Sequence, residues 1–157
     1  MKEPPEVLYA KPGSLSRLPG FSSGAGEKES GMKFLSRYLM IGTAGFIGAI
    51  TRVVVATLFG RLGWRFPLGT LFINVSGSMF LGWFLTVATE RYSLSDTIRL
   101  SIGAGFVGAY TTFSTFMFES NRLVDDGAGL EAILNLLVSL MLGLLAVRLG
   151  IILGHRA

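Results

Sequence analysis

Residues 99–120 read RLSIGAGFVGAYTTFSTFMFES, and this stretch decides the fold. It is apolar and close to the ~20 residues that a helix needs to cross a bilayer. Its middle is nevertheless rich in residues that weaken a helix or pack closely, namely Gly103, Gly105, Gly108, Thr111, Thr112, Ser114 and Thr115. An interruption here would free backbone carbonyls, which membranes tolerate only where protein, an ion or a water-filled cavity meets them. The other interpretation is a continuous helix whose small residues pack against a neighbouring helix.

Three further apolar runs of similar length accompany this stretch. We predict helices at about 37–59, 68–90, 98–120 and 130–153, joined by short connections at 60–67, 91–97 and 121–129. Charged side chains gather at the ends of the runs, whereas a soluble four-helix bundle would carry polar faces within them. The sequence therefore predicts an all-α membrane protein with four transmembrane helices in residues 32–157.

The composition excludes several functions. Half of the residues are hydrophobic and only 15% are charged, against about 25% charged in an average soluble domain. Cysteine is absent and the one histidine is His155, which leaves no thiolate metal site and no well-placed Ser-His-Asp triad. The net charge of +4 comes from scattered basic residues that border the apolar runs, without a basic face for nucleic acid. We therefore predict neither an enzyme nor a nucleic-acid-binding protein.

Residues 1–31 differ in composition from the rest of the chain. They hold four of the five prolines together with many Gly, Ser, Lys and Glu, which is typical of a disordered segment. Their longest apolar stretch is too short for a signal peptide. Met32 and the apolar residues after it read like the natural start of a membrane protein. We therefore predict that residues 1–31 are a dispensable tail or a mis-called upstream start.

A few polar side chains lie inside the apolar runs. Asn74 either forms a hydrogen bond across helices or offers N–H groups to an anion, and Asn135 and Ser139 share one helix face. Arg52 could reach the interface, be a buried structural charge, or attract anions in a vestibule. No acidic residue lies near the middle of any run, which disfavours proton-coupled export of cations and cation-selective pores.

Phe113 and Phe116 are three residues apart and therefore share a face of a helix. The edges of aromatic rings are positive, so ring edges directed into a pore would stabilise a small anion without binding it tightly. The alternative is simple contact with lipid, which is the default for any single Phe of an apolar helix. Together with the neutral donors of the Asn, Ser and Thr side chains, the ring edges suit a small anion.

Three segments resemble the CrcB/Fluc fluoride channels: GFVGAYTTFSTFMFE at 105–119, PLGTLFINVSGSMFLG at 67–82, and GAITR ending at Arg52. The resemblance covers about residues 33–153. It implies an antiparallel, dual-topology dimer of four-helix subunits, with the third helix broken at mid-membrane and with two fluoride pores. The pore and anion-binding residues that it implies here are Asn74, Phe113, Phe116, Asn135 and Ser139, with Ser114 and Thr115 as further donors.

The resemblance also implies a structural Na⁺ at the dimer centre, held by the backbone carbonyls of Gly108 and Thr111. Two residues between them depart from the family pattern. Ala109 replaces a frequent second Gly, and Tyr110 stands where a smaller or apolar residue is common. The carbonyl site should survive these changes because it uses only the main chain.

The function implied by the resemblance is passive export of fluoride through the inner (plasma) membrane, which gives fluoride resistance. The channel would be a homodimer or a heterodimer with a paired homologue. The balance of Lys and Arg at the ends of the runs predicts that both termini lie in the cytoplasm. Two other functions remain open: a small drug or metabolite transporter, and a membrane scaffold that uses a GxxxG interface formed by Gly150 and Gly154.

Overall fold

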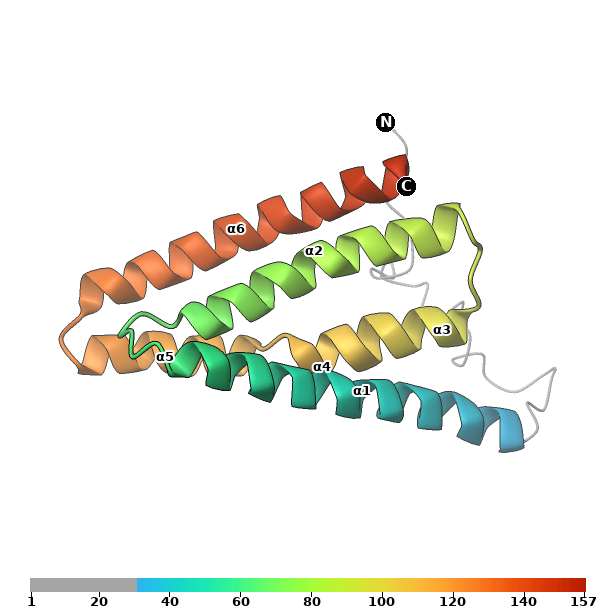
Figure 1. Cartoon of the computed structure of the whole chain (residues 1–157), viewed down its shortest axis with the longest axis horizontal. Coiled ribbons are helices and arrows are strands. Elements are labelled where there is room, and N and C mark those ends of the chain that lie inside the picture. Colours follow the sequence, from blue (N-terminus) through green and yellow to red (C-terminus); the bar gives the residue numbers. More distant parts are fainter. Residues whose placement is uncertain (1–30) are drawn as a thin grey trace, which may run out of the picture. The chain divides into compact units, whose positions relative to one another are not determined.

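The described part of the chain is entirely helical in its regular structure. The computed structural model describes residues 31–157, so the predicted tail lies outside the described residues except for Gly31. Residues 35–157 form one compact unit. Its elements are shown in Figure 1: α1 (Gly31–Gly60), α2 (Leu68–Glu90), α3 (Asp96–Leu100), the π-helix η2 (Ser101–Val107), α4 (Gly108–Tyr110), α5 (Phe113–Asp125) and α6 (Gly129–Arg156).

Three of the described helices are long and apolar enough to cross a membrane. They are Phe34–Gly60, Leu68–Glu90 and Gly129–Arg156. The remaining run, residues 96–125, is divided among α3, η2, α4 and α5, so none of its pieces has the length of a membrane span. These pieces nevertheless follow one another in a single direction beside α2 (Figure 1). The third apolar run of the sequence thus forms several short helical segments and not one continuous helix.

The helices extend further than the apolar runs predict. The predicted connection 121–129 is wrong over its first part, because α5 continues to Asp125. The amide Nδ2 of Asn121 donates to Oδ2 of Asp125 at 3.0 Å, one turn further along the same helix. The turn itself is short and contains Gly127, whose φ of 74° favours glycine. Polar residues here end the apolar run without ending the helix, since they pair along the helix surface.

Helices α2 and α6 pack closely because α6 presents glycines to the backbone of α2. A Cβ atom on Gly150 would lie 2.1 Å from the carbonyl oxygen of Met79. A Cβ atom on Gly154 would lie 2.7 Å from Cβ of Thr86. The predicted GxxxG contact of a scaffold is therefore occupied by a helix of the same chain.

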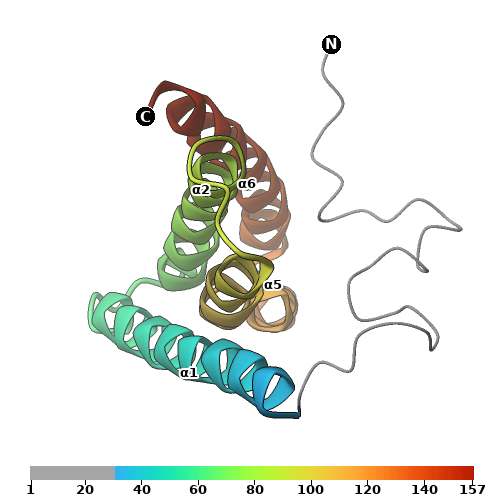
Figure 2. The same ribbon diagram turned by 90° about the vertical axis from the view of Figure 1, so that its right-hand side faces the viewer.

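Helix α1 runs across the divided run (Figure 2), and glycines bring its backbone close to that of the π-helix η2. A Cβ atom on Gly48 would lie 2.2 Å from the carbonyl oxygen of Phe106. A Cβ atom on Gly105 would lie 2.7 Å from the carbonyl oxygen of Ile41. Two glycines on opposite sides of the crossing thus let the backbones meet, and they position the first half of the divided run.

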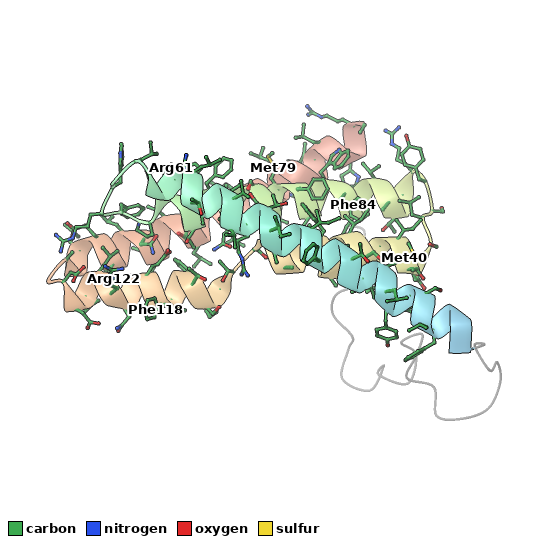
Figure 3. The ribbon with its side chains drawn as sticks, turned by 60° about the horizontal axis from the view of Figure 1, so that its bottom comes forward. Met40, Arg61, Met79, Phe84, Phe118 and Arg122 are labelled. Carbon is green, nitrogen blue, oxygen red and sulfur yellow. The ribbon has the colours of Figure 1, made fainter. Side chains whose placement is uncertain are left out.

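The surface of residues 35–157 is strongly apolar along the helices. Large hydrophobic side chains are exposed on every long helix, among them Phe46, Phe72 and Leu140. Figure 3 shows Arg61 and Arg122 toward one end of this unit and Met40 toward the other. An apolar surface of this extent, with charges toward the ends, fits lipid and subunit contact better than water.

Candidate functional site

The divided run is interrupted at two extended residues. Helix α4 ends at Tyr110, Thr111 has φ −77° and ψ 158°, and Thr112 has φ −150° and ψ 116° before α5 begins at Phe113. Thr112 is the N-cap of α5, because its Oγ1 accepts a hydrogen bond from the backbone N–H of Thr115 at 3.2 Å. Threonine is a favoured N-cap residue. The hydroxyl-rich sequence therefore both allows the interruption and starts the next helix.

Asn74 on α2 pairs with the backbone of Thr112. Its Nδ2 donates to the carbonyl oxygen of Thr112 at 3.0 Å, and its Oδ1 accepts from the N–H of Thr112 at 2.8 Å. A carboxamide offers one donor and one acceptor side by side, which matches the two groups of one extended residue. Two backbone groups that have left the helical pattern are thereby satisfied, and so is an amide in apolar surroundings.

Several backbone carbonyls lose their helical donors at the interruption, and those of Gly108 and Thr111 are among them. In an α-helix the carbonyl of Gly108 would accept from the N–H of Thr112, which instead donates to Asn74. The carbonyl of Thr111 would accept from the N–H of Thr115, which instead donates to the Thr112 side chain. Gly108 and Thr111 are the residues whose carbonyls are predicted to hold Na⁺. Neutral oxygens freed in this way fit the preference of a hard cation for oxygen ligands.

A cavity of about 450 Å³ lies beside the interruption. Helices α2, α5 and α6 contribute to its wall, and it brings together five of the predicted site residues: Asn74, Thr111, Phe113, Phe116 and Ser139. None of the described residues that line it carries a charge. Its wall therefore combines hydroxyl and amide groups with aromatic rings and aliphatic side chains.

Phe113 and Phe116 form an edge-to-face pair at this cavity. Their ring centroids are 6.2 Å apart and the planes are inclined at 67°. Phe113 is 74% exposed on this chain, whereas Phe116 is partly covered. A ring exposed to this degree on an apolar protein is available for an ion, lipid or a second subunit.

Asn135 lies away from the cavity wall in a buried hydrogen-bond chain. Its side chain is 1% exposed, and its Nδ2 donates to Oγ of Ser120 at 2.9 Å. Ser139, which does line the cavity, donates to Oδ1 of Asn135 at 3.4 Å. The sequence does not indicate Ser120 as a hydrogen-bond partner of Asn135, because only the contact between α5 and α6 brings the two together. Polar groups therefore continue from the cavity into the α5–α6 interface.

The other predicted residues lie at different places. Ser114 and Thr115 are exposed at the start of α5, where both hydroxyls lie near Oγ1 of Thr112 at 3.4 Å and 3.0 Å. Arg52 is partly buried on α1. It lines neither of the two cavities described here.

A second cavity, of about 410 Å³, lies where α1 ends and α2 begins. Its wall includes Arg65, Glu119 and Arg122, and Nη2 of Arg65 donates to the carbonyl oxygen of Asp126 at 2.7 Å. Oε2 of Glu119 is buried without a hydrogen-bond partner among the described residues. In the sequence, Glu119 lies at the end of an apolar run. Its place in a cavity depends on the neighbouring α1–α2 connection, which local hydropathy does not reveal.

Comparison with known proteins gives a consistent result. The family described as CrcB-like protein, Camphor Resistance (CrcB), matches residues 39–151. A protein of Acidobacterium capsulatum named fluoride-specific ion channel FluC is 46% identical over 121 residues, which is 76% of this chain and 97% of that protein. The protein of that name from Methylococcus capsulatus is 45% identical over 117 residues, 74% of this chain and 51% of that protein. A protein of Moorella thermoacetica named fluoride-specific ion channel FluC 2 is 41% identical over 114 residues, which is 72% of this chain and 92% of that protein.

Proposed function

The chain belongs to the CrcB family, and from this premise we propose that it is a fluoride-selective channel. It lets fluoride leave the cytoplasm passively and so protects the cell from fluoride. The protein is a multi-pass membrane channel, not an enzyme. The match to the family covers residues 39–151, which include both the interruption and the residues that line the cavity beside it.

The observation that carries this proposal is the chemistry of the cavity at the interruption. Fluoride is small and strongly hydrated, so a pore must replace its water with close donors. Asn74 keeps one amide hydrogen beyond the one bonded to Thr112, and Phe113 and Phe116 supply positive ring edges. The hydroxyls of Thr111 and Ser139 also line the cavity, with their protons bonded to Val107 and Asn135 in this structure. A fixed positive charge in the same place would bind the anion too tightly for rapid release.

The finer architecture is also part of the proposal. The interruption lies at mid-membrane, the divided run is the third of four membrane crossings, and two subunits associate antiparallel in the inner (plasma) membrane. Gly108 and Thr111 supply two carbonyl oxygens per chain, which is too few to surround a cation. A second copy related by a two-fold axis would supply two more, at the contact between the interruptions. A Na⁺ ion bound there would add positive potential shared by both pores.

The partner is a second copy of this chain or a paired homologue of opposite orientation. Two relatives carry the names FluC 2, from Moorella thermoacetica, and FluC 1, from Symbiobacterium thermophilum. Numbered names are consistent with more than one such protein per organism. With both termini in the cytoplasm, as the basic residues indicate, a partner of opposite orientation completes the proposed dimer.

The scaffold and transporter interpretations have less support. Gly150 and Gly154 contact α2 of the same chain and are not free for another protein. The cavity at the interruption offers no carboxylate among its described wall residues for a proton or an organic cation.

The proposal is tested by fluoride efflux from liposomes that contain the purified protein, recorded with a fluoride electrode and repeated with chloride. Rapid fluoride loss without chloride loss is expected. If the chain alone is silent, it is co-expressed with any homologue from the same genome and tested again. Absence of selective fluoride efflux in both experiments would contradict the proposal.

A further inference from the structure

Tyr110 is the last residue of α4 and directly precedes the interruption. Its side chain is buried, with 8% exposed, and its hydroxyl lies 3.0 Å from Oγ of Ser76 on α2. This is also a position where the sequence departs from the family pattern. The channel chemistry proposed above assigns no role to this residue.

The direction of the hydrogen bond follows from the other partner of Ser76. Oγ of Ser76 donates its one proton to the carbonyl oxygen of Ile73 at 3.2 Å. The hydroxyl of Tyr110 must therefore be the donor and Oγ of Ser76 the acceptor. The bond connects the end of α4 to the backbone of α2 through a serine whose own position is fixed.

The ring of Tyr110 is held on two sides. It stacks on Phe106 with centroids 6.0 Å apart and planes inclined at 6°. On the side of α2, its Cδ1 would lie 3.3 Å from a Cβ atom on Gly77, so the absence of a side chain there makes room for the ring. The hydroxyl is thus delivered to Ser76 by a ring with little freedom to move.

Thr111 therefore lies between two residues that are each bonded to α2. Tyr110 is bonded through Ser76, and Thr112 is bonded through Asn74. The carbonyl of Thr111 has lost its helical donor, so its direction depends on the residues on either side. Rotation of the peptide group between Thr111 and Thr112 would break the contact with Asn74. The preceding peptide group is held by the bond from the N–H of Thr111 to the carbonyl oxygen of Val107 at 2.9 Å, and the Tyr110 side chain fixes the end of the helix that carries this bond.

We propose that the Tyr110 hydroxyl is a positioning group for the backbone carbonyls at the interruption. Through Ser76 it holds the oxygens of Gly108 and Thr111 in the direction that binds a monovalent cation. The proposal deepens the function proposed above and rests on the Na⁺ site that is part of it. The side chain itself touches neither the cation nor fluoride.

The test compares Tyr110→Phe, Ser76→Ala and the double variant with the wild-type protein. Cation binding is read from the rise in unfolding temperature as NaCl replaces N-methylglucamine chloride at constant ionic strength. A neutral hydrogen bond is worth a factor of roughly 3 to 10 in a binding constant. Each single variant should therefore need about 3 to 10 times more Na⁺ for the same rise, and the double variant should need no more than the singles.

Tyr92→Phe is the matched control, because Tyr92 is 70% exposed in the connection after α2 and lies outside the interruption. It should need the same Na⁺ concentration as the wild type. A Tyr110→Phe protein that unfolds at a lower temperature but keeps the wild-type Na⁺ dependence would overturn the inference. The bond between Tyr110 and Ser76 would then stabilise the fold without affecting cation binding. Absence of any Na⁺ effect on the wild type would also overturn it. Fluoride efflux is recorded separately, so failure of the channel function is distinguished from failure of this inference.

Discussion

The α2–α6 interface and the interruption at Thr111–Thr112 both depend on small residues, yet they use them in opposite ways. At the interface, Gly150 lets two continuous helices approach until a backbone oxygen of α2 fills the space. At the interruption, the N–H groups of Thr112 and Thr115 no longer donate to helical carbonyls. They donate instead to the side chains of Asn74 and Thr112. The first arrangement leaves the helical backbone intact, and the second frees backbone carbonyl oxygens, including those of Gly108 and Thr111. Close helix packing and the proposed ion chemistry thus lie in different regions of one small protein.

The largest effect is expected from Gly150→Ala, which breaks the interface. The added Cβ would lie 2.1 Å from the carbonyl oxygen of Met79, and backbone cannot rotate away as a side chain can. Overpacking usually costs about 1–3 kcal/mol, and a clash with backbone should exceed the upper value. Thermal unfolding of the purified protein in detergent measures the loss.

Gly143→Ala on the same helix is the control for this variant. The atom nearest to its added Cβ would be Oγ of Ser78 at 3.9 Å, an ordinary contact. It should be neutral or gain up to ~1 kcal/mol from helix propensity. Equal unfolding temperatures for the two alanine variants would show that the interface tolerates a Cβ.

Asn74→Leu is expected to have the next largest effect, because it breaks the arrangement at the interruption. It leaves the N–H and the carbonyl of Thr112 without partners, at about 1–3 kcal/mol for each buried group. Both bonds are only partly buried, so we expect a loss near the lower end of the sum, about 2–3 kcal/mol, together with a fall in fluoride efflux. Asn74→Asp keeps the acceptor for the N–H of Thr112 and should be less destabilised. Hydrogen exchange of residues 108–116 should rise in the order wild type, Asp, Leu, and unchanged exchange in the leucine variant would count against the pairing.

The variants Phe113→Ile and Phe116→Ile should change conduction without changing the fold, because their rings lie at the cavity. Removal of an aromatic edge worth ~0.5–1.5 kcal/mol should lower fluoride efflux by up to about tenfold. Phe118→Ile is the control, since Phe118 is 70% exposed on the same helix and does not line the cavity. Unchanged efflux in both test variants would refute a role of the ring edges.

The smallest effect is expected at the end of the α2–α6 interface. Nδ1 of His155 lies 2.8 Å from Oε2 of Glu90, and both side chains are about half exposed. Exposed ion pairs contribute at most ~1 kcal/mol. His155→Ala should therefore shift the unfolding temperature only slightly and leave fluoride efflux unchanged. A loss comparable to that of Gly150→Ala would mean that the interface depends on its polar end and not on glycine packing.

Some features of the candidate site could be predicted from neighbouring residues in the sequence, and others depend on contacts between distant residues. The apolar runs, the spacing of Phe113 and Phe116, and the hydroxyl-rich stretch around Thr112 are properties of neighbouring residues. The end of α5 was misplaced because hydropathy falls at Asn121 while the helix continues to Asp125. The place of Glu119 in a cavity could not be predicted, because that cavity is formed by a connection distant in sequence.

Hydropathy and family motifs are local patterns, so the sequence alone identifies a helical membrane protein with the motifs of a fluoride channel. The partners of its polar groups, in contrast, follow from the packing of the helices. Asn74 meets Thr112 across 38 residues of sequence, and Gly150 meets Met79 on another helix. Neither contact leaves a trace in local periodicity. A hydrogen bond depends on the position of two atoms in space, and that position follows from how the helices pack.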